Sequence, residues 1–145
     1  MAIRLIRHGE SFANIGEKRW DSPLTEKGIT QSSKLKGHYD LVILSPMRRA
    51  QETYIYSQID CDECVYCESC REIKKGISDH LLFESLKRET EDEFETRINL
   101  LMEELRNYSQ KYKNIVVFTH GGVIRNICKL DRHVENCESI IMTLD

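Results

Sequence analysis

The sequence predicts an α/β fold, a three-layer α/β/α sandwich with a mainly parallel central sheet. Short β-branched apolar runs alternate along the chain with longer segments of helical periodicity. Two of the runs are apolar almost throughout, as expected for strands that are buried on both faces of a parallel sheet. Because such a sheet needs a helix layer on each side, the alternation favours three layers. The length of 145 residues, without a low-complexity linker or a repeat, predicts one domain over residues 1–145.

Four segments are expected to be strands because β-branched and other apolar residues dominate them. They are Ala2–His8, Leu41–Ser45, Asn114–His120 and Ser139–Asp145. The second and third of these are the near-continuous apolar runs, so they are expected to lie between the two helix layers.

Four further segments are expected to be helices, namely Thr25–Tyr39, Pro46–Ile59, Glu91–Tyr112 and Gly122–Leu130. Pro46 suits the first helical position of the second segment, and Ser45 suits the N-cap before it. The third segment has the clearest pattern, because its apolar residues recur at i, i+3 and i+4 spacing. It opens with a capping-box sequence at Thr90–Glu93.

Composition and charge exclude several classes of protein. Charged residues make up 31% and hydrophobic residues 40% of the chain, which is typical of globular proteins. The formal net charge of −3 argues against a nucleic-acid or membrane-surface binder, so an anion site must be local. No apolar run approaches the roughly 20 residues of a membrane span, and the first residues lack the apolar core of a signal peptide. We therefore expect a cytoplasmic location; nothing in the sequence indicates an oligomeric state.

Basic side chains follow three of the predicted strands. In open α/β sheets, ligands bind beyond the carboxyl ends of the strands. Arg7 and His8 leave one strand at that edge, and His120 leaves another. Arg49 follows a third strand by about one helical turn. Two imidazoles and two guanidiniums would thus converge at one edge, which predicts a pocket for a phosphoryl group.

The motifs that carry these residues occur in a fixed order. They are LIRHGES (Leu5–Ser11), SPLTEKG (Ser22–Gly28), SPMRRAQET (Ser45–Thr53) and VVFTHGGVIRNI (Val116–Ile127). Asn14 also stands six residues after His8. In these elements the chain resembles the histidine phosphatase superfamily, which includes cofactor-dependent phosphoglycerate mutases and many small phosphatases. The resemblance is collinear from about Arg4 to Asp145 and implies the phosphoglycerate mutase-like fold.

The resemblance also implies roles for individual residues. His8 would be the nucleophile that forms a phosphohistidine intermediate, which divides the phosphoryl transfer into two steps. The charge of the transferring group would be stabilised by further donors, which are Arg7, Arg49, His120, Asn14 and the backbone N–H of Gly121. Ser11 is a further candidate ligand. No metal ion and no cofactor would be needed, because the cations belong to the protein.

Two assignments depend on motif position. The phosphate-binding arginine of the family directly precedes an alanine, which selects Arg49 before Ala50 and leaves Arg48 as an exposed neighbour. The resemblance places the acid and base at Glu72, since CREIKKG matches the family's Glu with Gly four residues later. The residues after Gly76 depart from the family's commonest continuation. Three other histidines match no motif position and are expected at the surface: His38, His80 and His133.

Four cysteines at a spacing of three form CDECVYCESC at residues 61–70. Pairs of this kind can hold zinc or an iron–sulfur cluster. If Val65–Cys70 is a strand, residues three apart point to opposite faces, and the four thiols cannot surround one ion. Small structural thiols are therefore favoured, with a metal held mainly by Cys61 and Cys64 as the alternative.

The leading hypothesis is a metal-independent phosphatase that hydrolyses phosphate monoesters of a small metabolite or a phosphoprotein. A mutase is disfavoured because Ile73 stands where mutases of this family carry a basic residue, and because the loop between Asn14 and Leu24 is short. A protein phosphatase acting on phosphohistidine or phosphotyrosine remains an alternative. The last alternative is an inactive module that binds a phosphorylated ligand.

Overall fold

A computed structural model of the chain describes residues 1–144 and contains one five-stranded sheet. The strands are β1 (Ala2–Arg7), β2 (Lys36–Leu44), β3 (Gln58–Tyr66), β4 (Ile115–Thr119) and β5 (Ser139–Thr143). Their order is β3-β2-β4-β1-β5, and all neighbouring pairs are parallel except β1 and β5. The sheet is therefore mainly parallel, as predicted, with one antiparallel edge strand.

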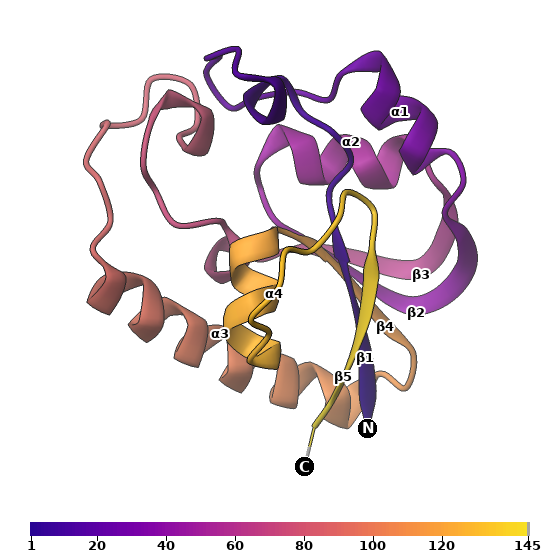
Figure 1. Cartoon of the computed structure of the whole chain (residues 1–145). Coiled ribbons are helices and arrows are strands. Elements are labelled where there is room, and N and C mark those ends of the chain that lie inside the picture. The colour runs from indigo at the N-terminus through magenta and orange to yellow at the C-terminus, as the bar shows by residue number, and fades with distance from the viewer. Residues whose placement is uncertain (145) are drawn as a thin grey trace.

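Helices cover both faces of this sheet (Figure 1). They are α1 (Glu26–Ser32), α2 (Arg48–Tyr56), α3 (Glu91–Lys111) and α4 (Gly121–Cys128), with 3₁₀ turns η1 (Phe12–Ile15), η2 (Glu68–Cys70) and η3 (Ile77–Asp79). α1 and α2 pack together on one face, and α3 and α4 lie on the other. The prediction of a three-layer α/β/α fold is confirmed.

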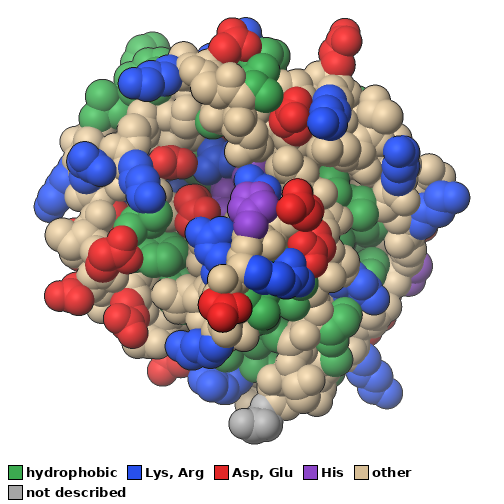
Figure 2. Space-filling model, in the orientation of Figure 1, with side chains coloured by type: hydrophobic (Ala, Val, Ile, Leu, Met, Phe, Trp, Pro, Cys, Tyr) green, Lys and Arg blue, Asp and Glu red, His purple; other side chains and the backbone are tan. Residues whose placement is uncertain are grey.

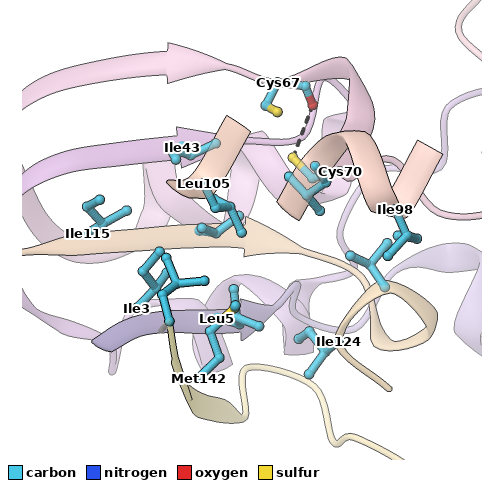
Figure 3. Packing of buried hydrophobic residues seen from close by; sticks show 14 of the residues in the cluster. Ile3, Leu5, Ile43, Cys67, Cys70, Ile98, Leu105, Ile115, Ile124 and Met142 are labelled. Atoms are coloured by element: carbon cyan, nitrogen blue, oxygen red, sulfur yellow. Dashed lines mark hydrogen bonds between the residues drawn. The ribbon is translucent and has the colours of Figure 1, made fainter. Parts of the chain in front are cut away.

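Alternate residues of the central strands enter two separate cores. In β4, Val117 belongs to the larger cluster beneath α3 and α4, whereas Phe118 belongs to the smaller cluster beneath α2. Leu5 and Ile6 of β1 divide in the same way. Figure 3 shows the larger cluster, where side chains from the sheet meet those from α3 and α4. The near-continuous apolar runs in the sequence therefore reflect burial on both faces.

The predicted helix Thr25–Tyr39 is wrong in its second half, because α1 ends at Ser32 and β2 begins at Lys36. The first part of β2 is largely exposed and pairs only with β3. Its side chains carry no apolar alternation, since no helix layer covers this extension of the sheet. The polar sequence of this segment therefore did not indicate a strand.

The boundaries of α2 and β3 also differ from the prediction. The N-cap of α2 is Met47 rather than Ser45, and Ser45 makes a side-chain contact to His120 instead. The helix ends at Tyr56, so β3 occupies the end of the predicted helix 46–59. The predicted strand Val65–Cys70 is wrong beyond Tyr66, where the chain turns into η2.

α3 matches its predicted range to within one residue. The side chain of Thr90 accepts a hydrogen bond from the N–H of Glu93, and the Glu93 carboxylate accepts one from the N–H of Thr90. This is the capping box expected from the sequence. α4 begins at Gly121, one residue before its predicted start.

Within residues 1–144, no helix is long and apolar enough to cross a membrane.

Candidate active site

A cavity of about 210 Å³ opens at the carboxyl ends of the parallel strands. Seven of the eight predicted site residues line it, namely Arg7, His8, Ser11, Asn14, Arg49, Glu72 and Gly121. In Figure 2, blue and purple side chains gather in a recess near the centre of the face, with red side chains beside them. The eighth predicted residue, His120, is fully buried beside His8, with the two ring centroids 5.3 Å apart.

The imidazole of His8 is oriented by its own backbone neighbour. Its Nδ1 atom lies 2.7 Å from the carbonyl oxygen of Gly9. A carbonyl can only accept, so Nδ1 carries the proton and Nε2 keeps its lone pair. Burial, followed by the positive charge of Arg49, lowers the pKa of His8 well below its usual value. His8 is therefore neutral at pH 7 and has the form that a nucleophile requires.

The residue after His8 must be glycine, because the backbone at Gly9 passes close to the backbone at Gly28. A Cβ atom at Gly9 would lie 2.7 Å from the carbonyl oxygen of Gly28, at the beginning of α1. The N–H of Gly9 also donates to the hydroxyl of Thr53 on α2, at 2.9 Å. The RHG and SPLTEKG motifs and the helix that carries Arg49 are thereby fixed to one another behind the cavity.

His120 is held from one side only. Its Nε2 atom lies 2.8 Å from the hydroxyl of Ser45, while its buried Nδ1 atom has no hydrogen-bond partner within residues 1–144. Burial, and then the charge of Arg49, lower the pKa of His120 well below its usual value. The unpartnered Nδ1 is the ring atom of His120 that remains for a ligand.

Two guanidiniums are fixed in the cavity wall by backbone carbonyls. Arg7 donates to the carbonyl oxygen of Val134 at 2.8 Å, and its Nε atom has no hydrogen-bond partner within the described chain. Arg49 donates to the carbonyl oxygen of Ser78 at 2.7 Å and pairs with Asp79 at 3.0 Å. Both side chains are nearly buried, so their charges are weakly screened and favour an anion in the cavity.

Arg48 points away from this cavity. More than half of its side chain is exposed, and it pairs with Glu52 one helical turn further on. The prediction that Arg48 is a solvent-exposed neighbour of Arg49 is confirmed.

Asn14 is oriented by donors on two segments. Its Oδ1 atom accepts from the N–H of Ser11 at 2.9 Å and lies 3.3 Å from the Nδ2 atom of Asn136. Asn136 also donates to the carbonyl oxygen of His8, at 3.1 Å. With Oδ1 occupied by these donors, the amide nitrogen of Asn14 is the group available to an anion.

Glu72 stands at the boundary between two cavities. Its carboxylate accepts hydrogen bonds from the N–H groups of Gly122, at 2.9 Å, and Ile73, at 3.1 Å. A Cβ atom at position 122 would lie 2.8 Å from Oε2 of Glu72, so a larger residue there would displace this carboxylate. Glu72 also lines a second cavity of about 410 Å³, which shares Asp79, Gly122 and Arg125 with the first.

Arg97 of α3 fixes the backbone that carries Glu72. Its guanidinium donates to the carbonyl oxygens of Ser69 at 2.9 Å and Glu72 at 3.1 Å, and also to that of Arg71. A 2.7 Å ion pair with Glu89 holds the guanidinium in place. The loop around Glu72 is thus tied to a helix by one charged side chain rather than by strand pairing.

Arg71 ties the same loop to the residues that follow it. Its side chain is almost fully buried and pairs with Glu68 at 2.8 Å and Glu84 at 2.7 Å. It also donates to the carbonyl oxygen of Asp79 at 2.9 Å. The guanidinium lowers the pKa of the Glu84 carboxyl to about 2. Residues 68–84 are therefore folded around a buried cation.

The structure adds site residues that the motifs did not single out. They are Ser45, Asp79, Arg97, Arg125 and Asn136. Ser45 stands in a recognised motif, and its position after a buried strand was the available signal. Arg97 is one of many polar residues of α3. Its position in the sequence gives no indication of what its side chain contacts. Asp79 and Asn136 lie in segments whose conformation the sequence did not specify. Arg125 lies in the predicted helix Gly122–Leu130 and in the motif Val116–Ile127, but neither indicated that its side chain lines the cavity.

One expectation about the remaining histidines is wrong. His38 and His133 are exposed, as predicted, but His80 is fully buried. The Nδ1 atom of His80 lies 2.6 Å from the carbonyl oxygen of Gly76, and Nε2 lies 3.0 Å from that of Lys87. His80 therefore joins two backbone segments inside the loop that follows Glu72.

The four clustered cysteines do not share one location. Cys61 and Cys64 lie on β3, whereas Cys67 and Cys70 enter the larger core (Figure 3). The thiol of Cys70 donates to the carbonyl oxygen of Cys67 at 3.0 Å. Among residues 1–144, no group of three or more His, Cys, Asp or Glu side chains is arranged to hold a metal ion. The structure gives the metal alternative no support.

Comparison with known families identifies the class of this chain. The model of the histidine phosphatase superfamily (branch 1) matches residues 3–99, so the chain belongs to that superfamily. Its members are phosphatases and mutases, and the matched range includes the motifs at Leu5–Ser11 and Ser45–Thr53 that contribute residues to the cavity.

Individual relatives agree with the fold. Fructose-2,6-bisphosphatase of Saccharomyces cerevisiae is 25% identical over 98% of this chain, which spans only 36% of that protein. Crystal structures of TTHB049 from Thermus thermophilus (TM-score 0.78, 24% identity) and of the alpha-ribazole phosphatase from Shigella flexneri (0.72, 21%) are similar. The matches cover 99% of this chain and 94% of TTHB049, and 100% of this chain and 91% of the Shigella protein. A phosphoglycerate mutase from Thermus thermophilus matches with a TM-score of 0.66 at 24% identity, over 97% of this chain and 92% of the mutase.

Proposed function

We propose that the chain is a phosphatase that hydrolyses phosphate monoesters through a phosphohistidine intermediate on His8. One observation carries the proposal: a neutral, oriented imidazole with Nε2 unprotonated lines a cavity walled by Arg7 and Arg49. Such a site can hold the charged oxygens of a phosphoryl group while a nitrogen attacks phosphorus. The names of the relatives, two phosphatases and a mutase, support phosphate-ester chemistry.

In the first step, Nε2 of His8 forms a bond to phosphorus as the bond from phosphorus to the ester oxygen breaks. Glu72 in its acid form gives its proton to the leaving oxygen, which departs as an alcohol. Arg7, Arg49 and the N–H of Gly121 would bind the oxygens of the phosphoryl group during the transfer. His120 and Asn14, with Ser11 at the rim, are proposed to complete the set of donors.

In the second step, water replaces the alcohol. The Glu72 carboxylate accepts a proton from the water, whose oxygen forms a bond to phosphorus as the bond to Nε2 breaks. Inorganic phosphate leaves, and His8 regains its neutral form. The N–H groups of Ile73 and Gly122 donate to the Glu72 carboxylate and hold it at the boundary of the cavity. Every proton that moves is held by Glu72, water or the alcohol.

The second cavity indicates where the leaving group lies. Glu72 separates it from the phosphoryl cavity, so an alcohol placed there has its oxygen beside the acid. The volume of about 410 Å³ suits a small metabolite, and both an apolar surface at Phe94 and a cation at Arg125 line it. We therefore propose a small phosphorylated metabolite as the substrate class, with a phosphoprotein as the alternative.

The test is phosphate release from p-nitrophenyl phosphate in EDTA, from about pH 4.5 to 8, with wild type, His8→Ala and a matched His38→Ala control. Loss of His8 should lower the rate by about 10³-fold or more, because Nε2 of His8 is the atom proposed to attack phosphorus. The exposed His38 should be replaceable without loss. Wild type should also yield a phosphorylated His8 peptide after rapid quench into alkali, in which the bond between phosphorus and the imidazole nitrogen is stable.

Two results would contradict this function. Activity that survives in His8→Ala would remove His8 as the nucleophile. A folded wild-type protein that releases no phosphate from this ester or from any phosphorylated metabolite would point instead to a phospho-ligand binding module. The mutase alternative would be supported instead by movement of the phosphoryl group between two hydroxyls of a phosphorylated substrate without release of inorganic phosphate.

A further inference from the structure

Ser45 and His120 form a buried contact that no step of the proposed reaction explains. Ser45 follows β2 and His120 follows β4, and both side chains are fully buried. The Ser45 hydroxyl lies 2.8 Å from Nε2 of His120. Geometry alone allows either atom to donate, and the choice decides which nitrogen of His120 carries a proton.

We propose that Ser45 is a positioning residue, whose hydroxyl donates to Nε2 of His120 and thereby keeps the imidazole proton on Nδ1. Nδ1 is the ring atom without a partner in the described chain, so its N–H would be free to donate to a phosphoryl oxygen on His8. The inference deepens the proposed function and rests on it for the identity of that oxygen.

The direction of the bond follows from the partners of the hydroxyl. Ser45 Oγ already accepts a hydrogen bond from the backbone N–H of Met47 at 3.3 Å. Its own proton needs an acceptor, because a buried hydroxyl without one is unfavourable. Within residues 1–144, Nε2 of His120 is the acceptor that it contacts. If Nε2–H donated instead, Oγ would accept twice and the hydroxyl proton would be left unpaired.

The direction of this hydrogen bond matters because a neutral imidazole carries one ring proton, on either Nδ1 or Nε2. Burial and the nearby charge of Arg49 keep the pKa of His120 well below its usual value, so the ring is neutral at pH 7. A neutral imidazole with its proton on Nε2 would present a lone pair to the phosphoryl group. That lone pair would repel the anion, whereas Nδ1–H attracts it. Ser45 therefore determines whether His120 helps or opposes the reaction.

The same contact also explains the shifted start of α2. Because the Ser45 hydroxyl is engaged by His120 and by the Met47 N–H, it does not cap the helix, and Met47 becomes the N-cap. Arg49 follows in the first turn of α2. Ser45 thus contacts both His120 and the segment that leads into Arg49.

The first test is direct and does not depend on turnover. Two-bond nitrogen–hydrogen correlation spectra of protein with ¹⁵N-labelled histidine distinguish a protonated from an unprotonated ring nitrogen. The His120 signals are assigned with His120→Gln. Near pH 7, wild type should show a protonated Nδ1 and an unprotonated Nε2 at His120. The opposite pattern in wild type would overturn the proposal.

The second test uses matched variants. Ser45→Ala should lose the wild-type tautomer pattern and lower kcat by about tenfold to 100-fold. This is less than the roughly 10²–10³-fold loss expected when a donor to a transferring group is removed outright, because His120 itself remains. Ser45→Thr keeps the hydroxyl and should retain the pattern. Ser69→Ala removes an equally buried hydroxyl that contacts Glu104 instead, and it should change neither readout.

Two outcomes separate this inference from the proposed function. A folded Ser45→Ala protein with the wild-type tautomer would overturn the inference even if wild type is an active phosphatase. If wild type released no phosphate, the proposed function would fail, and the tautomer of His120 in wild type and in Ser45→Ala would still decide the role of Ser45.

Discussion

The two halves of the candidate site are held in place in different ways. His8, Arg49 and His120 leave the ends of adjacent strands or the first turn of a helix, and their backbone is fixed by sheet pairing. Glu72 lies on a loop that no strand pairs with. Its backbone is fixed by the guanidinium of Arg97, and the residues after it are wrapped around Arg71.

This difference has an energetic meaning. Strand ends are positioned by many backbone hydrogen bonds and by a core on both faces, so no single side chain decides their place. A loop held by two arginines depends on a few charge-assisted bonds, each of which one substitution can remove. We therefore expect the backbone of the nucleophile half to keep its position when a neighbouring side chain is replaced, and the backbone of the acid half to move when a distant side chain is replaced.

The largest effect is expected from replacing Glu72, because this change should remove acid–base catalysis while leaving His8 able to form the phosphohistidine. Glu72→Gln should lower kcat for an alkyl phosphate by about 10²–10⁴-fold, because general acid–base catalysis contributes about that much. The loss should be smaller for the first step with p-nitrophenyl phosphate, whose leaving oxygen needs little protonation. Labelling with a rapid quench into alkali should show phosphohistidine accumulating on His8. Equal losses for both esters, with no labelled enzyme, would contradict the division into two halves.

A smaller effect is expected from the loop anchor. Arg97→Gln should lower kcat by about tenfold to 100-fold by releasing the backbone around Glu72, since misplacing a catalytic group costs activity. KM and the labelling of His8 should change little. Arg106→Gln, an exposed arginine on the same helix, is the matched control and should behave as wild type. A folded Arg97→Gln protein with wild-type kcat would show that the loop does not depend on this side chain.

The smallest expected effect concerns stability. His8 and His120 have folded-state pKa values below those of the unfolded chain, which therefore binds more protons between the two values. The free energy of unfolding should fall as the pH drops below about 6.5, by up to about 1.4 kcal/mol per pH unit for each histidine. Urea titrations between about pH 5 and 7 would measure the slope, and His120→Gln should reduce it.

The loss of stability that His8 and His120 cause on acidification can be distinguished from the effects of other titratable groups. Carboxyls with a lowered pKa, such as Glu84 at about 2, begin to reduce stability only near and below pH 4.5. The pKa of the exposed His38 is raised by its hydrogen bond to Asp60, so its contribution has the opposite sign. His38→Gln should therefore preserve the loss on acidification. A slope that is unchanged in His120→Gln would mean that folding does not lower the pKa of this histidine.

The parts of the molecule that could be predicted are those governed by periodic burial and by short motifs. The central strands β1 and β4 and the helix α3 follow from apolar patterns, and the residues at their ends follow from position. The exposed extension of β2 and the 3₁₀ turn at Cys67–Cys70 have no such pattern. Local spacing thus indicated a strand where tertiary contacts favour a turn.

The remaining site residues could not be predicted because they act through contacts distant in sequence. Arg97 reaches Glu72 across 25 positions, and Asn136 reaches His8 across 128. Nothing local distinguishes these side chains from other polar residues of a helix or a loop. His80 was misplaced for the same reason, since both of its carbonyl partners lie in a loop whose path the sequence does not specify.

The unpartnered nitrogens described for Arg7 and His120 have a thermodynamic consequence for the protein without ligand. Both atoms are buried, and a buried donor without an acceptor costs about 1–3 kcal/mol. A bound phosphate would supply acceptors for both and would bind only the folded chain. Inorganic phosphate should therefore raise the melting temperature in a concentration-dependent way. The pocket is a locally destabilised region of the fold, and its affinity for phosphate and its cost to stability have the same physical origin.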